Sequence, residues 1–287
     1  MPRVLVTGAA GLIGRAVVAR LLASGVPVTA LILESGTVDG ARVVVGDARD
    51  PEVVAGALDD VDAVIHLAAI PSPLADPAER VFAVNTQATF TVLDQAGRAG
   101  VRRVALASSY AIGGLPFAPH RLTMPYLPVD TALPLQIHDA YALSKRVDEE
   151  TAAMMHRRYD MTVVALRLPF VGTADDRLAT TAAHFRTTPE AGASDVWSYL
   201  DSRDAARALV SALSPARPGC HVLYVAAPET LAPDPTDDLL ARFHPSTPRP
   251  SFPGRTVPID LEPARELIGF TAEHPFPVGR SGGVMPG

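Results

Sequence analysis

Residues 4–14, VLVTGAAGLIG, decide the fold of this chain. An apolar, β-branched run leads into Gly8, Gly11 and Gly14, and an Ala/Val/Leu-rich segment follows to about residue 25. The pattern predicts a buried strand, a tight turn and the start of a helix, because glycine tolerates positive φ and lets a ligand approach the backbone closely. The free N–H groups and the positive dipole of a helix N-terminus favour an anion. The diphosphate of a nucleotide is therefore the first ligand to consider.

The composition indicates a globular protein with a small-molecule ligand. Of the 287 residues, 48% are hydrophobic and 20% are charged, and the formal net charge is −6. An acidic chain lacks the basic surface of sequence-independent nucleic-acid binding, and no apolar run is long enough for a membrane span. Neither nucleic acid nor membrane is therefore an expected partner. The eight histidines show no metal-ligand spacing, so we expect no metal.

Cysteine usage and the first residues bear on the location of the protein. Cys220 is the only cysteine, which excludes an intrachain disulfide, and we interpret it as a small buried hydrophobic residue. The chain leads straight into a predicted strand, without the basic and apolar segments of an export signal. We therefore expect a cytoplasmic protein.

Strand-like and helix-like segments alternate over the first two-thirds of the chain. Strands are expected near residues 3–7, 28–33, 42–45, 62–67, 102–107 and 162–167. This alternation predicts an α/β fold with a doubly wound parallel sheet of the Rossmann type, whose ligands bind at the carboxyl ends of the strands. We expect residues 1–168 to form a dinucleotide-binding domain, with contributions from about 201–227, and residues 169–287 to form a smaller, interleaved substrate-binding lobe.

A second motif, YALSK at residues 141–145, places a phenol and an ammonium on one face of a predicted helix. A phenol is a weak base at neutral pH because it loses its proton only near pH ~10. A nearby cation stabilises the phenolate, so Tyr141 beside Lys145 can exchange a proton with a substrate oxygen while a nicotinamide exchanges a hydride. The spacing alone is common by chance, and its plain alternative is an aromatic residue beside a solvated lysine.

Taken together, these segments resemble the extended short-chain dehydrogenase/reductase family, in its NAD-dependent epimerase/dehydratase group. The resemblance covers residues 1 to about 227. It rests on TGAAGLIG (7–14), GDARD (46–50), HLAA (66–69), Asn85, Ser108-Ser109, YALSK and YLDSRDAARA (199–208). It implies an NAD(P)-dependent oxidoreductase that interconverts a secondary alcohol and a carbonyl by hydride transfer.

The resemblance implies roles for the matching positions. Ser109 bonds the reacting oxygen, Tyr141 is the acid/base, and Lys145 binds the nicotinamide ribose and acts on Tyr141; these three are the expected catalytic residues. We expect the cofactor to be bound by Gly8, Ala10, Gly11, Leu12, Ile13, Glu34, Asp47, Ala48, Leu67, Ala68, Ala69, Asn85, Ala107, Tyr141, Lys145 and Pro169. We expect the substrate to be bound by Ser109, Tyr110, Phe170, Trp197 and Arg203.

Several of these residues have plain structural alternatives. Trp197 can pack the small lobe, Arg203 can form a surface salt bridge, and Asp47 can be a turn residue. His66, on a strand, is expected to be a satisfied core histidine rather than a base. Asn85 is expected to support the site from the helix that packs behind it.

The residues after the second predicted strand bear on the choice of cofactor. Many NAD-using relatives end this strand with an acidic residue, whereas this chain has Ile32 and Leu33 there and carries Glu34 next. A carboxylate at this place repels a 2′-phosphate, which favours NAD. NADP stays open, since Arg42 could reach inward.

Two departures from the family pattern bear on the substrate. PFVGT at residues 169–173 replaces the FNVYG of nucleotide-sugar enzymes, and Tyr110-Ala111 replaces the Asp-Glu pair of dehydratases. We therefore expect a small polar, sugar-like substrate such as an aldose, a uronate or a natural-product intermediate. The alternatives are a sugar or nucleotide-sugar epimerase that retains its NAD, and a non-catalytic nucleotide sensor acting through residues 228–287. Relatives pair through the helices expected at 78–99 and 140–159, which predicts a homodimer.

Overall fold

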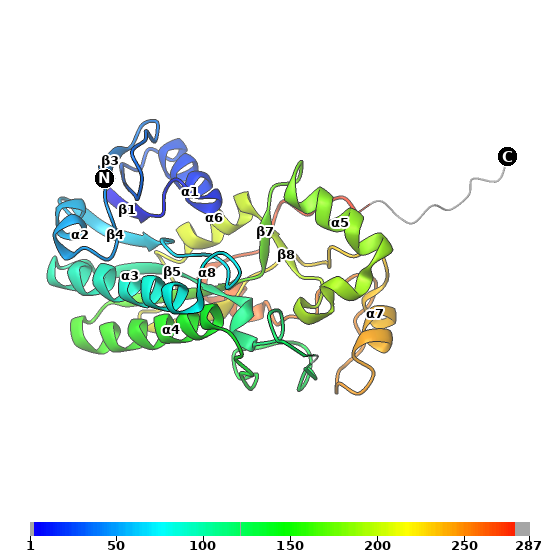
Figure 1. Ribbon diagram of the computed structural model, residues 1–287. Coiled ribbons are helices and arrows are strands. Elements are labelled where there is room, and N and C mark those ends of the chain that lie inside the picture. Colours follow the sequence, from blue (N-terminus) through cyan, green and yellow to red (C-terminus); the bar gives the residue numbers. More distant parts are fainter. Residues whose placement is uncertain (1–2, 121, 279–287) are drawn as a thin grey trace.

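A seven-stranded parallel sheet forms the centre of the computed structural model, which describes residues 3–120 and 122–278 (Figure 1). The strands are β1 (Arg3–Thr7), β2 (Val28–Ile32), β3 (Arg42–Val45), β4 (Val61–His66), β5 (Arg103–Ser109), β6 (Thr162–Leu168) and β9 (Cys220–Tyr224). Their order is β3-β2-β1-β4-β5-β6-β9, and all six pairings are parallel. The predicted doubly wound parallel sheet is confirmed. The strand order reverses at β1, so the carboxyl ends of β1 and β4 border the crevice where ligands of such sheets bind.

Helices cover both faces of the sheet (Figure 1). One face carries α1 (Leu12–Ala23), α6 (Ser202–Ser211) and α8 (Glu262–Ile268), and the other carries α2 (Pro51–Ala57), α3 (Ala78–Arg98) and α4 (Ala140–Tyr159). Each face of the sheet has its own hydrophobic core beneath these helices. Alternate residues of a strand contribute to the two cores, because successive side chains of a strand point to opposite faces. In β1, Val4 and Val6 pack with α1, whereas Leu5 packs in the core beneath α3 and α4.

A further hydrophobic core, here called the second core, lies beyond the carboxyl ends of β6 and β9. It is built on a two-stranded parallel sheet, β7 (Phe170–Gly172) and β8 (Tyr199–Asp201), with α5 (Arg177–Thr187) and α7 (Thr236–Phe243). Two 3-10 helices, η1 (Tyr110–Gly113) and η2 (Pro189–Asp195), also contribute. This core adjoins the sheet edge at which the ligand is expected. The predicted lobe at 169–287 also includes residues 279–287, which lie outside the described residues.

Four elements of this region lie in stretches of mixed or proline-rich composition. The stretch 169–199 contains β7, α5 and β8, and the proline-dense stretch 228–258 contains α7. The sequence of α5, RLATTAAHFRT, is rich in threonine, which favours helices weakly, and the helix buries only Leu178, Ala182 and Phe185. Burial of these three side chains in the second core therefore supports a helix that local preference alone does not predict.

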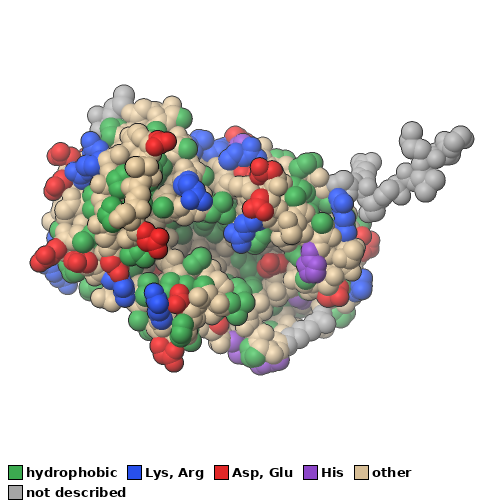
Figure 2. Space-filling view, turned by 45° about the horizontal axis from the view of Figure 1, so that its top comes forward, with side chains coloured by type: hydrophobic (Ala, Val, Ile, Leu, Met, Phe, Trp, Pro, Cys, Tyr) green, Lys and Arg blue, Asp and Glu red, His purple; other side chains and the backbone are tan. Residues whose placement is uncertain are grey.

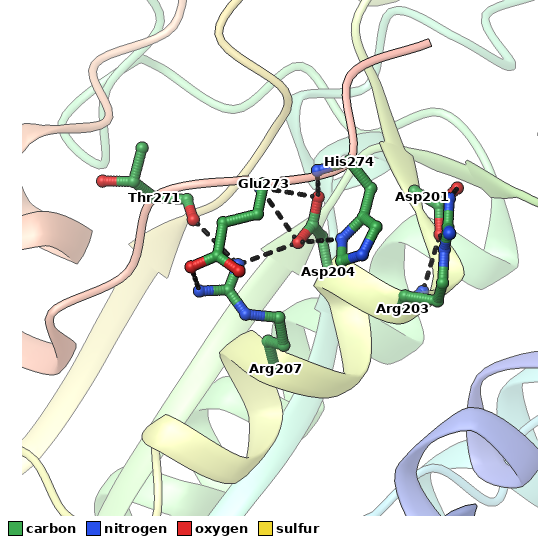
Figure 3. A network of polar contacts seen from close by, with 7 residues as sticks. All are labelled: Asp201, Arg203, Asp204, Arg207, Thr271, Glu273 and His274. Carbon is green, nitrogen blue, oxygen red and sulfur yellow. Dashed lines mark hydrogen bonds and ion pairs between the residues drawn. The ribbon is translucent and has the colours of Figure 1, made fainter. Parts of the chain in front are cut away.

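A buried carboxylate on α6 fixes the last described segment of the chain (Figure 3). Asp204 accepts hydrogen bonds from the backbone N–H groups of Glu273 and His274, at 3.0 and 2.7 Å, and pairs with Arg207 at 2.9 Å. Burial alone would raise the pKa of Asp204, but its hydrogen bonds from His274, Glu273 and Arg207 outweigh burial and lower it. In addition, the Tyr199 hydroxyl accepts from the N–H of Phe276 at 2.7 Å. These contacts hold residues 271–278 against α6 and β8.

None of the helices within residues 3–120 and 122–278 is long and apolar enough to cross a membrane.

Candidate active site

The turn between β1 and α1 leaves no room for side chains at two glycines. Gly8 has a φ of +64°, and a Cβ atom on it would lie 2.9 Å from the backbone nitrogen of Ala68. A Cβ atom on Gly14 would lie 2.2 Å from the Gly8 carbonyl oxygen. The α1 helix follows with no side-chain cap at Gly11 and no acidic residue in its first turn. Its N-terminal N–H groups are therefore left for a diphosphate, which fits the cofactor predicted from the sequence.

The ends of β1 and β4 are tied together beside this turn. The Thr7 hydroxyl oxygen accepts hydrogen bonds from the N–H groups of Leu67 and Ala68, each at 3.1 Å. These bonds hold the backbone of residues 67–68 directly against Gly8. The structure thus brings together the predicted residues Gly8, Leu67 and Ala68.

The predicted adenosine end of the site carries an exposed acidic group, and Arg42, the arginine considered for a 2′-phosphate, is engaged elsewhere. Glu34 is exposed just after β2. Arg42 is the first residue of β3 and so lies at the amino-terminal end of the parallel strands, whereas Glu34 follows the carboxyl end of β2. The Arg42 guanidinium donates to the Thr29 hydroxyl and to the carbonyls of Ala57 and Asp59. It therefore does not reach inward, which removes the argument for NADP that rested on it.

Asp47, predicted to contact the adenine, is paired with its neighbour. Arg49 donates to both carboxylate oxygens, with Nη2 at 2.5 Å from Oδ2 and the backbone N–H at 2.8 Å from Oδ1. The side-chain hydrogen bond from Arg49 is the main cause that lowers the pKa of Asp47. Contact with adenine stays a prediction and would use the lone pairs that Arg49 leaves open.

Strand alternation separates the two serines that end β5. Ser108 is buried and donates to Oε1 of Glu149 at 2.6 Å. Ser109 points to the other face, is half-buried, and accepts from the N–H of Ala111 at 3.1 Å. The Ser108 hydroxyl proton is thus used by Glu149, whereas the Ser109 hydroxyl only accepts a hydrogen bond and keeps its proton. Ser109 can therefore donate a hydrogen bond to a reacting oxygen at the carboxyl end of β5.

The Tyr141 and Lys145 side chains lie together on α4, as the helical spacing predicts. Nζ of Lys145 lies 5.9 Å from the centre of the Tyr141 ring. It donates to the Ala107 carbonyl at 3.1 Å and to Oδ2 of Asp148 at 3.2 Å. Of its three N–H groups, one has no acceptor among the described residues and is available to a ligand. Lys145 is the only lysine in the chain.

Asn85 supports the site from inside the protein. Its side chain is fully buried on α3 and exchanges hydrogen bonds with the backbone of Ile70, accepting at 2.7 Å and donating at 3.1 Å. It also donates to the Ser144 hydroxyl on α4 at 3.0 Å. Asn85 therefore fixes the loop after β4 relative to the helix that carries Tyr141, and it acts on the cofactor site through these neighbours.

The structure corrects one predicted substrate contact. Trp197 has no exposed surface, and its indole N–H donates to the Pro189 carbonyl at 2.6 Å. Trp197 therefore packs in the second core, which is the structural alternative given for it above. It does not contribute to a substrate pocket in this conformation. Tyr110 is also largely buried, with its ring 6.0 Å from that of Tyr224 and its hydroxyl without a partner.

The two remaining predicted substrate residues are accessible. Phe170 is half-buried at the start of β7 and lies two residues after Leu168, the register partner of Ser109. The Arg177 guanidinium lies 4.9 Å from the Phe170 ring centre. Arg203 pairs with Asp201 at 2.8 Å while 58% of its side chain stays exposed (Figure 3). The surface salt bridge weighed as an alternative for Arg203 is thus present.

Sequence reasoning missed two neighbours of the Tyr141–Lys145 pair. The Phe117 ring meets the Tyr141 ring edge to face, with centroids 6.4 Å apart. Asp148 accepts from Lys145 from within the same helix. The three-residue spacing of Lys145 and Asp148 is a signal that could have indicated this pair. The long loop before α4 gives no such signal for Phe117.

His66 is a satisfied core histidine, as predicted. Its side chain is 2% exposed, and its ring nitrogens lie 2.7 Å from the Thr7 hydroxyl and 3.1 Å from the Thr89 hydroxyl. Burial, and secondly the charge of Lys145, lowers the pKa of His66 to about 3. The ring is therefore neutral at physiological pH. The part of the chain that the structure describes contains no group of three or more His, Cys, Asp or Glu side chains arranged to hold a metal.

The molecular surface has a hollow in the middle of the face that Figure 2 shows. Hydrophobic and uncharged side chains form the floor of this hollow, and charged side chains surround it. Such a surface suits a small ligand with both apolar and polar groups.

Comparisons with known proteins show the family to which this chain belongs. The sequence pattern of the NAD dependent epimerase/dehydratase family matches residues 4–224. The 3-diazoavenalumate denitrifying reductase of a Streptomyces species is 31% identical over 293 aligned residues, which cover 97% of this chain and 91% of that protein. The L-arabinose 1-dehydrogenase (NAD(P)(+)) of Haloferax volcanii is 31% identical over 182 residues, which cover 61% of this chain and 70% of that enzyme.

A solved structure extends the likeness over the whole fold. It is a short-chain dehydrogenase/reductase superfamily protein from Agrobacterium tumefaciens with bound NAD. The two chains share 27% sequence identity and superpose with a TM-score of 0.71, covering 96% of this chain and 94% of the other.

Proposed function

Since the chain belongs to the NAD-dependent epimerase/dehydratase family, and is thereby an NAD-using enzyme of the short-chain dehydrogenase/reductase type, we propose that it interconverts a secondary alcohol and a carbonyl on a small polar, sugar-like substrate. The observation that carries this proposal is the grouping of Ser109, Tyr141 and Lys145 at the carboxyl edge of β5. A sensor would need none of these three groups.

The three side chains divide the work on the reacting oxygen. When bound, NAD supplies the hydride acceptor for the alcohol or the hydride donor for the carbonyl. As the carbon loses its hydride, Tyr141 takes the hydroxyl proton, and in the reverse direction it returns that proton to the carbonyl oxygen. The Ser109 hydroxyl donates a hydrogen bond to the same oxygen. Lys145 stabilises the Tyr141 phenolate and directs its remaining N–H to the ribose.

The proposed substrate class rests on two groups in the segment that follows β6. Phe170 offers an aromatic face, and Arg177 places a cation beside it. Together they suit a small ring or chain that carries hydroxyl and anionic groups, such as an aldose or a uronate. Of the two relatives above, one is named an L-arabinose 1-dehydrogenase and the other a 3-diazoavenalumate denitrifying reductase. Neither name mentions a nucleotide, which supports a substrate that is a free small molecule.

Nicotinamide absorbance tests the proposed reaction. We expect purified protein to reduce NAD⁺ with at least one member of a panel of aldoses, uronates and polyols, or to oxidise NADH with the matching ketones. Tyr141→Phe should bind NAD normally and lose activity about 100-fold or more, because general acid–base catalysis contributes roughly 10²–10⁴-fold. A protein that retains NAD through purification and changes its absorbance with no substrate would instead be the epimerase.

We further propose that the protein is a homodimer of the cytoplasm. The outer surfaces of α3 and α4, which lie side by side in Figure 1, carry two exposed large hydrophobic side chains, Phe90 and Leu143, at 48% and 43% exposure. A second copy of the same helices would bury them. The lone Cys220 suits a reducing compartment, since burial raises the pKa of its thiol to about 11 and keeps it protonated.

A further inference from the structure

A buried ion pair lies directly behind Tyr141. Nζ of Lys145 is 3.2 Å from Oδ2 of Asp148, and the two side chains expose only 5% and 0% of their surface. Removing one partner of such a pair leaves an uncompensated charge inside the protein, which is strongly unfavourable. The ammonium that stabilises the Tyr141 phenolate therefore depends on a carboxylate that does not itself reach the substrate.

A chain of buried hydrogen bonds reaches Asp148 from the glycine turn. The Thr7 hydroxyl oxygen already accepts two backbone N–H groups, so its proton is directed to Nδ1 of His66. Because His66 is neutral, its proton is on Nε2 and faces the Thr89 hydroxyl. The Thr89 proton is then directed to Asp148. Burial, the largest cause, raises the pKa of this carboxyl group, and the charge of Lys145 and the hydrogen bond from Thr89 offset only part of that rise. Each donor in the chain thus points toward the carboxylate.

We propose that Asp148 is a positioning residue of the active site, which holds the Lys145 ammonium between Ala107 and Tyr141 and offsets part of its positive charge. Lys145 is fixed by two hydrogen bonds, one to the carbonyl of the half-buried Ala107 and one to the fully buried Asp148. Oδ1 of Asp148 is buried and has no hydrogen-bonding partner, so one oxygen of the carboxylate accepts no hydrogen bond. The inference rests on the roles proposed above for Tyr141 and Lys145.

The ionisable groups around Lys145 come from two elements of the fold. Asp148, Tyr141 and Glu149 on α4 act on its charge, and His66 on β4 faces it as a neutral ring. Burial alone would lower the pKa of Lys145, but the charge of Asp148 leads the opposing causes, and the pKa lies above its ordinary value. Glu149 is itself paired with Arg167 on β6 at 2.9 Å, which leaves Asp148 as the main counter-charge.

This arrangement ties the charge of Lys145 to one residue. Without the carboxylate, the ammonium would lose its counter-charge and give up its proton at lower pH. Asp148 thus sets the pH range in which a charged ammonium lies beside the Tyr141 ring.

The single lysine makes the test direct. Protein grown with lysine labelled with ¹³C at Cε has one lysine signal, that of Lys145, and its chemical shift follows the charge of the ammonium without any substrate. In Asp148→Asn, whose amide oxygen still accepts from Lys145, we expect the midpoint of this titration to fall by about one to three pH units. Asp148→Glu, which keeps the charge, should restore a midpoint close to the native one.

Asp94→Asn is the matched control. Asp94 is a largely buried carboxylate that pairs with Arg98 at 2.7 Å and accepts from Tyr159 at the far end of α4. At about 1.5 Å per residue, Tyr159 is roughly 20 Å along the helix from Lys145. The control should therefore leave the Lys145 midpoint unchanged. An equal shift in both variants, or none in Asp148→Asn, would overturn the proposal.

A further readout keeps the test decisive. If Asp148→Asn does not fold, the native protein still decides, because its Lys145 signal must stay that of the charged form beyond pH 10.5, and an earlier midpoint contradicts the proposal. The Lys145 signal does not depend on turnover, so failure to find a substrate would affect the proposed function and leave this inference standing.

Discussion

The carbonyl oxygen of Gly8 lies only 2.2 Å from the position that a Cβ atom on Gly14 would occupy. The first turn of α1 therefore packs directly against the glycine turn, backbone to backbone. This contact aims the helix N-terminus at the crevice between β1 and β4. Any side chain at position 14 must move either the helix or the turn, and both hold the diphosphate in the proposed site.

Gly14→Ala should weaken NAD binding and destabilise the protein. Overpacking of this kind costs about 1–3 kcal/mol, and the displaced turn should lower NAD affinity at least tenfold. Calorimetric titration with NAD⁺ and thermal unfolding measure the two effects. Gly56→Ala in α2 is the control, because a Cβ atom there meets nothing within 4 Å. It should leave NAD binding unchanged and raise stability by roughly 0.5–1 kcal/mol, as expected for glycine in a helix.

The exposed carboxylate of Glu34 should discriminate against NADP. A 2′-phosphate about 4 Å from it would be repelled by about 1 kcal/mol per unit charge in a water-like medium. Glu34→Gln should therefore raise the affinity for NADP⁺ by roughly fivefold or more, measured by calorimetric titration. Glu266→Gln, an exposed change on α8, should have no effect. If NADP⁺ bound the native protein as tightly as NAD⁺, the assignment of Glu34 would be wrong.

The buried neutral His66 should make the protein sensitive to acid. Its pKa is about 3 in the folded state and about 6.5 in the unfolded chain, so between these values the unfolded state binds one more proton. Stability is therefore full above pH ~6.5 and falls by about 1.4 kcal/mol per pH unit as the pH is lowered through this window.

His66→Gln should flatten this part of the stability profile. Glutamine can bond both Thr7 and Thr89 and does not titrate. Urea unfolding at several pH values between about 6.5 and 4 measures the slope. His184→Gln changes an exposed histidine and should keep the native slope. Equal slopes for all three proteins would show that His66 is charged or solvated in the folded state.

Charged residues at Phe90 and Leu143 should separate the proposed dimer. The variant carrying Phe90→Glu and Leu143→Glu places two carboxylates on the outer surface of α3 and α4, where a second copy would have to desolvate them. Light scattering after size-exclusion chromatography should give the mass of a dimer for the native chain and of a monomer for the variant. Leu74→Glu, at the most exposed large hydrophobic residue, should stay dimeric. A monomeric native protein would refute the interface.

The parts of the fold that were predicted from the sequence are those set by local pattern. The β1 turn needs glycine at positions 8 and 14, and the strands of the main sheet are short apolar runs that begin and end within three residues of the expected positions. The motif that carries Tyr141 and Lys145 depends only on helical spacing. These features are visible because each is decided within a few consecutive residues.

The features that escaped prediction depend on distant contacts. Trp197 is removed from the pocket by packing with Phe243 and by its bond to the Pro189 carbonyl, neither of which its neighbours in sequence reveal. The partners of Asp148 include Thr89 and, through it, His66, on two other elements of the fold. Long-range contacts of this kind also explain α5, whose helix depends on the core it covers.

A crystal structure with NAD⁺ bound tests the central claim most directly. The account predicts the diphosphate at the N-terminus of α1, Nζ of Lys145 within hydrogen-bonding distance of the nicotinamide ribose while still bonded to Asp148, and the Tyr141 hydroxyl facing the open side of the nicotinamide ring beside Ser109. A nicotinamide bound away from Ser109, or a Tyr141 hydroxyl turned from the ring, would contradict it.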